Sequence, residues 1–240
     1  MSPVKAIARL TLTRLRRSRV RWLIGAMCLL PIVIAVLAVA MRGYAHHHWR
    51  DIGELSLRSL TLLMPTLLMA GAVGDEQQGK TYSYLWSRPI PRPAIIHGKL
   101  LATLPVMAAA MTASLTAAFL LVLFGSRGEA EWSWLLRTLG AGLLGLVCAS
   151  AVAAGLGSLF PKRPLVAVLA WVLLFEQLVP EVPAAQNLMT LHHVRVLAAL
   201  PGDDPQGSVI GSVIGLIVLT AIWLGVASWR VNRVELSGEG

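Results

Sequence analysis

Six long apolar segments constrain this chain more than any other feature of its sequence. About 20 consecutive apolar residues are enough for a helix to cross the hydrocarbon core of a bilayer. Lipid offers the backbone no hydrogen-bond partners, so each segment must form a helix that satisfies its own amide groups. The segments are Trp22–Met41, Leu55–Val73, Leu100–Phe124, Leu135–Phe160, Leu165–Val179 and Val209–Trp229.

The composition agrees with a membrane protein. Hydrophobic residues make up 56% of the 240 residues and charged residues only 14%, whereas a soluble domain carries about a quarter charged residues. We therefore predict an all-α membrane protein, residues 1–240 forming a single transmembrane domain with six transmembrane helices. The fifth segment is short and has Glu176 near its end, so we expect either a less tilted helix or a broken or re-entrant one.

The distribution of basic residues predicts the orientation. Six spans place both termini on one side, and this side holds fifteen of the 21 lysines and arginines. The positive-inside rule therefore assigns the termini to the cytoplasm. The basic residues flank the spans and have no stacking aromatic residues organised around them, so we expect no binding to nucleic acid.

Residues 1–21 are predicted to form an amphipathic helix that lies in the cytoplasmic membrane interface. Lys5, Arg9 and Arg16 lie away from an apolar face, and such a helix is attracted to anionic lipid. The residues that recur at helical spacing on the apolar face are Val4, Ile7, Ala8, Thr11, Leu12 and Leu15.

A cytoplasmic loop at residues 74–99 contains the stretch Gly74–Thr81, which matches the P-loop pattern G-x-x-x-x-G-K-[ST]. A true P-loop follows a buried β-strand and opens a helix of an α/β domain. Here the stretch follows a transmembrane segment, and Asp75 and Glu76 would place carboxylates beside a phosphate. We therefore expect this chain to bind neither ATP nor another cofactor.

The rest of the loop predicts an element that contacts another molecule. Thr81–Trp86 is long enough for about two helical turns, and the prolines of Ser87–Pro93 then end the helix. Tyr84 and Trp86 are large amphipathic side chains near Arg88. Such residues anchor protein interfaces and also membrane interfaces, and both interpretations stay open on these residues alone.

This loop resembles the first cytoplasmic loop of type-2 ATP-binding-cassette (ABC) export permeases. The matching residues are Glu76, Gly79–Thr81, Tyr84–Leu85, Ser87–Pro89, Arg92 and Gly98–Lys99. The order of the six spans, the interfacial helix and the basic turn Pro161–Pro164 are also similar. The resemblance implies that a short cytoplasmic coupling helix seats on a separate ATP-binding subunit. The residues it assigns to that contact are Glu76, Thr81, Tyr84, Leu85, Arg88, Pro89, Arg92 and Lys99.

What the resemblance implies is a transport subunit and not an enzyme. ATP and Mg²⁺ would be bound by the partner subunit, and a second permease chain, identical or different, would complete the assembly in the bacterial inner membrane. The alternative is an ATP-independent secondary carrier or channel. The chain has only one acidic residue within a span, and no inverted repeat is evident, whereas carriers usually keep paired or relayed charges.

Three other features invite a functional interpretation. His46–His48 and His192–His193 lie in external loops, where they either bind a metal ion together or are solvated turn residues. Glu176 either serves transport or simply reaches water. The repeated G-x-x-x-G of Gly207–Gly215 predicts a close helix contact, within the chain or across a dimer.

Overall fold

The computed structural model describes residues 3–17, 20–40, 45–70, 93–125, 130–176, 183–202 and 207–233, and it confirms the all-α class. These residues are almost entirely helical, and no strand occurs among them. Their elements are α1 (Pro3–Arg17), α2 (Val20–Ala40), α3 (Ala45–Ser56), η1 (Leu57–Leu63), α4 (Met64–Met69), α7 (Pro93–Gly125), α8 (Trp132–Leu159), α9 (Pro164–Ala170), η2 (Trp171–Phe175), α11 (Pro183–Gln186), α12 (Thr190–Ala198) and α13 (Val209–Arg233).

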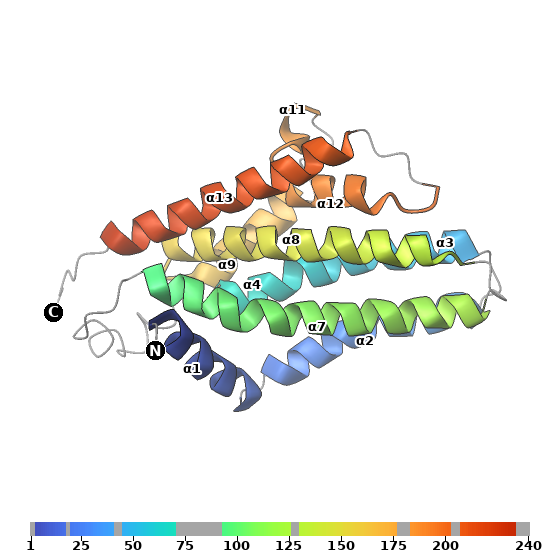
Figure 1. Ribbon diagram of the computed structural model, residues 1–240, viewed down its shortest axis with the longest axis horizontal. Coiled ribbons are helices and arrows are strands. Elements are labelled where there is room, and N and C mark those ends of the chain that lie inside the picture. Colours follow the sequence, from blue (N-terminus) through green and yellow to red (C-terminus); the bar gives the residue numbers. More distant parts are fainter. Residues whose placement is uncertain are drawn as a thin grey trace.

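Five helices of the described chain are long and apolar enough to cross a membrane. They correspond to the first four predicted segments and the sixth, and they run roughly along the long axis of the molecule (Figure 1). Helix α1 and the end of α13 lie at the same end of this axis (Figure 1). The spans are Val20–Ala40, Trp49–Met69, Pro93–Gly125, Trp132–Leu159 and Val209–Arg233. The chain is therefore a multi-pass membrane protein.

The fifth predicted segment, Leu165–Val179, differs from a full span in the residues that the structure describes. It forms an apolar helix over Pro164–Phe175, which at 1.5 Å per residue reaches about 18 Å and not the roughly 30 Å of a hydrocarbon core. Pro180 and Pro183 in the sequence are incompatible with an uninterrupted helix leading into α12. The α9–η2 helix and α12 are therefore two separate pieces, and α12 packs beside α8 and α13.

Helix α8 is the centre of the bundle and contacts α4, α7, α9, α12, α13 and η1. Small residues of α8 lie at several of these contacts. A Cβ atom built at Gly157 would overlap the backbone carbonyl of Ala70, at the end of α4. One built at Gly145 would overlap Val194 of α12, and one at Gly155 would lie 2.5 Å from the ring of Trp223 in α13. Glycine at these positions lets the helix backbones come together, which is how helices associate in lipid.

This packing predicts that substitutions of two glycines of α8 differ in their effect on stability. Gly157→Ala places a methyl group against the carbonyl of Ala70, so we expect the free energy of unfolding to fall by about 2 kcal/mol through overpacking. Gly140 has nothing within 4 Å of its would-be Cβ, and Gly140→Ala should leave stability unchanged or raise it, by up to about 1 kcal/mol. Thermal unfolding in detergent measures both variants. Equal losses from the two substitutions would contradict this packing.

Candidate functional site

The predicted partner-binding residues fall mostly outside the part of the chain that the structure describes. Lys99 lies in the second turn of α7 and is half-buried. The coupling helix expected at Thr81–Trp86 and the P-loop-like stretch Gly74–Thr81 also lie outside the described residues and stay predictions. The predicted partner-binding residues that lie outside the described part of the chain are Glu76, Thr81, Tyr84, Leu85, Arg88, Pro89 and Arg92. What the structure does show is how both ends of the 74–99 loop are held.

Helix α1 holds the end at which the loop enters α7. Ile7 is buried among Ala94 and Ile95 of α7, with Val4 packed beside them. A Cβ atom at Gly98 would lie 2.8 Å from the Cβ of Ile7 and 3.0 Å from the carbonyl oxygen of Val4. Gly98 therefore permits the close approach of the two helices, and this explains the glycine of the Gly98–Lys99 pair.

The apolar face predicted for α1 is the face that packs on the bundle. Ile7 is buried, and Val4, Ala8, Thr11 and Leu15 are half-buried. The basic residues Lys5, Arg9 and Arg14 are exposed, and so is Leu12 of the predicted face. The helix and most of its apolar face are thus confirmed, while its position in a membrane interface stays a prediction.

The other end of the loop leaves the bundle after α4. Ala70 is buried against Gly157 of α8, which has no side chain to keep the two backbones apart. The hydroxyl of Thr103 in α7 donates a hydrogen bond of 3.2 Å to the sulfur of Met69. The two ends of the loop are thus joined to α1, α7 and α8, so a force applied to the loop would reach all three helices.

A second polar site lies in the interior, where the fifth segment is broken. Both carboxylate oxygens of Glu176 accept hydrogen bonds, from the backbone N–H groups of Thr190 and Leu191, each at 3.0 Å. These are the first amides of α12, which have no partner within the helix, and the positive end of the helix dipole favours a carboxylate. The side chain of Thr190 lies 3.6 Å from Cys148, near the middle of α8.

Glu176 is therefore an internal cap that joins α9–η2 to α12 at mid-bundle, and it does not reach water as one sequence interpretation allowed. It is only 2% exposed. An adjoining cavity of about 10 Å³, lined by Thr66, Trp171 and Thr190, has room for about one water molecule. Among the described residues, the cavity beside Glu176 is too small for a solute larger than water.

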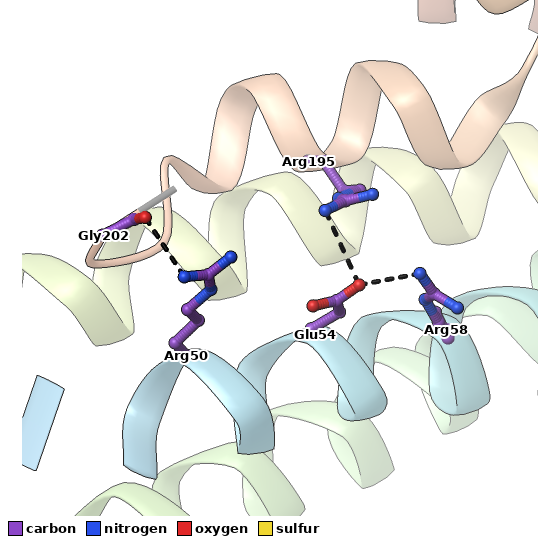
Figure 2. A network of polar contacts seen from close by, with 5 residues as sticks. All are labelled: Arg50, Glu54, Arg58, Arg195 and Gly202. Carbon is purple, nitrogen blue, oxygen red and sulfur yellow. Dashed lines mark hydrogen bonds and ion pairs between the residues drawn. The ribbon is translucent and has the colours of Figure 1, made fainter. Parts of the chain in front are cut away.

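A network of charges connects the same helix α12 to α3 and η1 (Figure 2). Helix α3 lies at the end of the bundle opposite α1 (Figure 1). One carboxylate oxygen of Glu54 lies 2.7 Å from Arg58 and 3.6 Å from Arg195 of α12. Arg50 donates a hydrogen bond of 3.2 Å to the carbonyl of Gly202, just after α12. Two arginines share one carboxylate, which fixes α12 to the second span at this end.

The histidines have different surroundings from those expected. His193 is buried, its Nε2 lies 3.0 Å from the carbonyl oxygen of Asn187, and a Cβ at Gly215 would lie 2.6 Å from its ring. The contact of the second G-x-x-x-G repeat is thus made within the chain at Gly215. Within the described part of the chain, no three His, Cys, Asp or Glu side chains are placed to hold a metal ion. The side chains of His46–His48 lie outside that part.

Sequence reasoning missed two features of these sites. The carboxylate of Glu176 caps a helix that begins fourteen residues later in the chain, and no local pattern announces such a pairing. Gly98 was noted only because it matches a residue of the family's loop pattern. Its contact with Val4 and Ile7 depends on α1, which is distant in the sequence.

Comparison with known proteins identifies one family. A family model described as ABC-2 family transporter protein matches residues 12–176. The match runs from α1 to the end of η2 and includes the whole 74–99 loop. No curated protein matches the chain significantly.

The Glu176 cap predicts a graded loss of stability. Glu176→Ala leaves the first amides of α12 unpaired in the interior, and we expect the free energy of unfolding to fall by about 3 kcal/mol. Glu176→Gln keeps one acceptor oxygen and should lose about half as much. Thermal unfolding in detergent tests the order of the two variants, with Glu131→Ala, at an exposed position, as the control. A loss no greater than the control's would show that the cap does not hold α12.

The charge network predicts coupling between Glu54 and Arg195. In a double-mutant cycle of Glu54→Gln and Arg195→Gln, we expect a coupling energy of about 0.5–1 kcal/mol. It should shrink at about 1 M salt, because ions screen partly exposed charges. The cycle of Glu54→Gln with Arg137→Gln, an exposed arginine of α8, should be additive. Equal coupling in the two cycles would exclude a specific network.

Proposed function

The chain belongs to the ABC-2 transporter family, and we propose that this permease subunit couples ATP hydrolysis in a separate partner to export across the membrane. The subunit itself is a transport subunit and not a catalytic one. The observation that carries the proposal is the family match over residues 12–176, because it covers the loop whose sequence resembles a coupling element.

The way the loop is held supports a mechanical role for it. The N-terminal end of α7 is locked to α1 at Gly98, and the end of α4 is locked to α8 at Gly157. Helix α7 is 33 residues long, with Pro105 inside it, and it reaches the opposite end of the bundle (Figure 1). A partner that moved the loop would therefore move α4 and α7 together, and packed helices respond to such a push as rigid bodies.

The proposal includes the partners and the location. An ABC ATP-binding subunit would bind ATP and Mg²⁺, and its differential affinity for two states of the permease would shift the equilibrium between them. A second permease chain would complete the complex. The membrane would be the bacterial inner membrane, with the termini in the cytoplasm, in keeping with the basic residues of α1, of the turn after α8 and of the end of α13.

The test is co-purification of the tagged full-length chain from its native membrane in mild detergent, followed by mass spectrometry. We expect a stoichiometric ATP-binding subunit that is lost when Tyr84, Leu85 and Arg88 are changed together to alanine, because aromatic and arginine anchors dominate protein interfaces. A matched control changes an aromatic residue, a leucine and an arginine that are exposed at the opposite end of the bundle. These are Trp132, Leu136 and Arg137.

The control triple variant should retain the partner. If the unmodified chain purifies without an ATP-binding subunit, the proposed coupling is wrong, and an ATP-independent carrier or channel becomes the function to assay. If both triple variants lose the partner equally, the contact is not made by the 74–99 loop.

A further inference from the structure

A groove of about 790 Å³ opens at the end of the bundle where α8 finishes and α9 begins. Its walls come from three elements, the end of α8, the α9–η2 helix and α13. Almost all of the lining surface is apolar, and it includes Trp171, whose ring is stacked on Phe175 and edge-on to Trp223. The apolar lining residues include Leu159, Val166, Ala167, Ala170 and Leu174.

The mouth of this groove is basic. Lys162 and Arg163 lie in the turn between α8 and α9, and Arg230 comes from the last turn of α13. The Nε atom of Arg230 is buried and has no hydrogen-bond partner among the described residues. No carboxylate is found among the residues that line the groove. Arg163 and Arg230 thus line an otherwise apolar groove, with Lys162 beside them, and the lining contains no carboxylate to pair with the two arginines.

The basic and apolar parts of the groove are arranged like the headgroup and acyl layers of a lipid leaflet. The turn between α8 and α9 lies at the end of the bundle that carries α1 and the C-terminal end of α13 (Figure 1), and this turn contributes Lys162 and Arg163 to the groove. The basic residues there predict the cytoplasmic surface. The apolar walls extend from this mouth toward the middle of the bundle, along α9 and η2. Charged groups at headgroup level above apolar walls at acyl depth are complementary to a phospholipid with an anionic head.

We propose that this groove binds one anionic phospholipid of the cytoplasmic leaflet. The phosphate lies against Arg163 and Arg230, with Lys162 at the rim, and one acyl chain follows the wall formed by Val166, Ala170 and Leu174. Arginine suits such a ligand, because its guanidinium donates paired hydrogen bonds to phosphate oxygens. Basic pockets between transmembrane helices on the cytoplasmic side bind anionic headgroups in this way.

The charges favour a lipid over a second copy of the chain. A two-fold dimer brings the same patch of both copies together, so an interface centred on this mouth would set the cations of one copy against those of the other. Such like-charge contacts are unfavourable, above all where water is excluded. A phosphate has the opposite charge and removes this repulsion.

The test is native mass spectrometry of the full-length chain with phosphatidylglycerol and with phosphatidylcholine of the same acyl chains. Unmodified protein should retain phosphatidylglycerol preferentially. Arg163→Gln with Arg230→Gln should lower that preference by about twenty-fivefold, at roughly fivefold per basic residue removed. The control, Arg137→Gln with Arg233→Gln, removes two exposed charges that do not line the groove, and it should change the preference little. Equal losses in the two variants, or equal retention of both lipids by unmodified protein, would overturn the proposal.

Photo-crosslinking identifies the occupant directly and does not depend on an ATP-binding partner. A photoreactive amino acid at Leu174, a groove residue that is 53% exposed, should give an adduct with the mass of an anionic phospholipid in native membranes. An adduct to a peptide, from the same chain or from a second copy, would show that protein fills the groove and would overturn the proposal.

Discussion

Close packing of neighbouring helices over the glycines of α8 is the interaction on which the rest of this structure depends. Lipid is as apolar as a leucine side chain, so helices in a membrane gain little by hiding apolar residues from it and associate through close packing instead. Each main neighbour of α8 approaches it over a different glycine. Gly142 faces α7, Gly145 faces α12, Gly155 faces α13 and Gly157 faces the end of α4. A displacement of any one of these neighbours would therefore act on the same central helix, α8.

The polar contacts then decide which of these neighbours move together. Helix α12 is held at its start by Glu176 and near its end by the Glu54–Arg195 pair. Helix α12 thus has two attachments, one to Glu176 within the bundle and one to the second span. The loop at 74–99 is attached through α4 and α7 at the other end. In the proposed function, movement of the loop would reach α12 through α8, which contacts all three.

Much of the architecture could be predicted from the sequence because membrane helices are dictated locally. An apolar run of span length admits little but a helix, and five of the six predicted segments are helices of spanning length. The apolar face of α1 followed from spacing alone. The fifth segment was harder, because its hydropathy resembles that of a span while Pro180 and Pro183 interrupt it. Hydropathy also does not show that Leu191 and Val194 of α12 are buried, because their burial follows from the packing of α12 against α8.

Contacts between distant parts of the chain could not be predicted in the same way. The partners of Gly98, Gly157 and Glu176 include backbone groups of other helices, and the spacing of residues in the sequence does not indicate these contacts. The partner-binding residues around Tyr84 rest on a resemblance, which the family match supports without locating a single contact. The most direct measurement is therefore photo-crosslinking from position 84 in native membranes, with position 136 at the opposite end of the bundle as reference. The account predicts an adduct to an ATP-binding subunit from position 84 and none from position 136. Absence of any protein adduct from position 84 would contradict it.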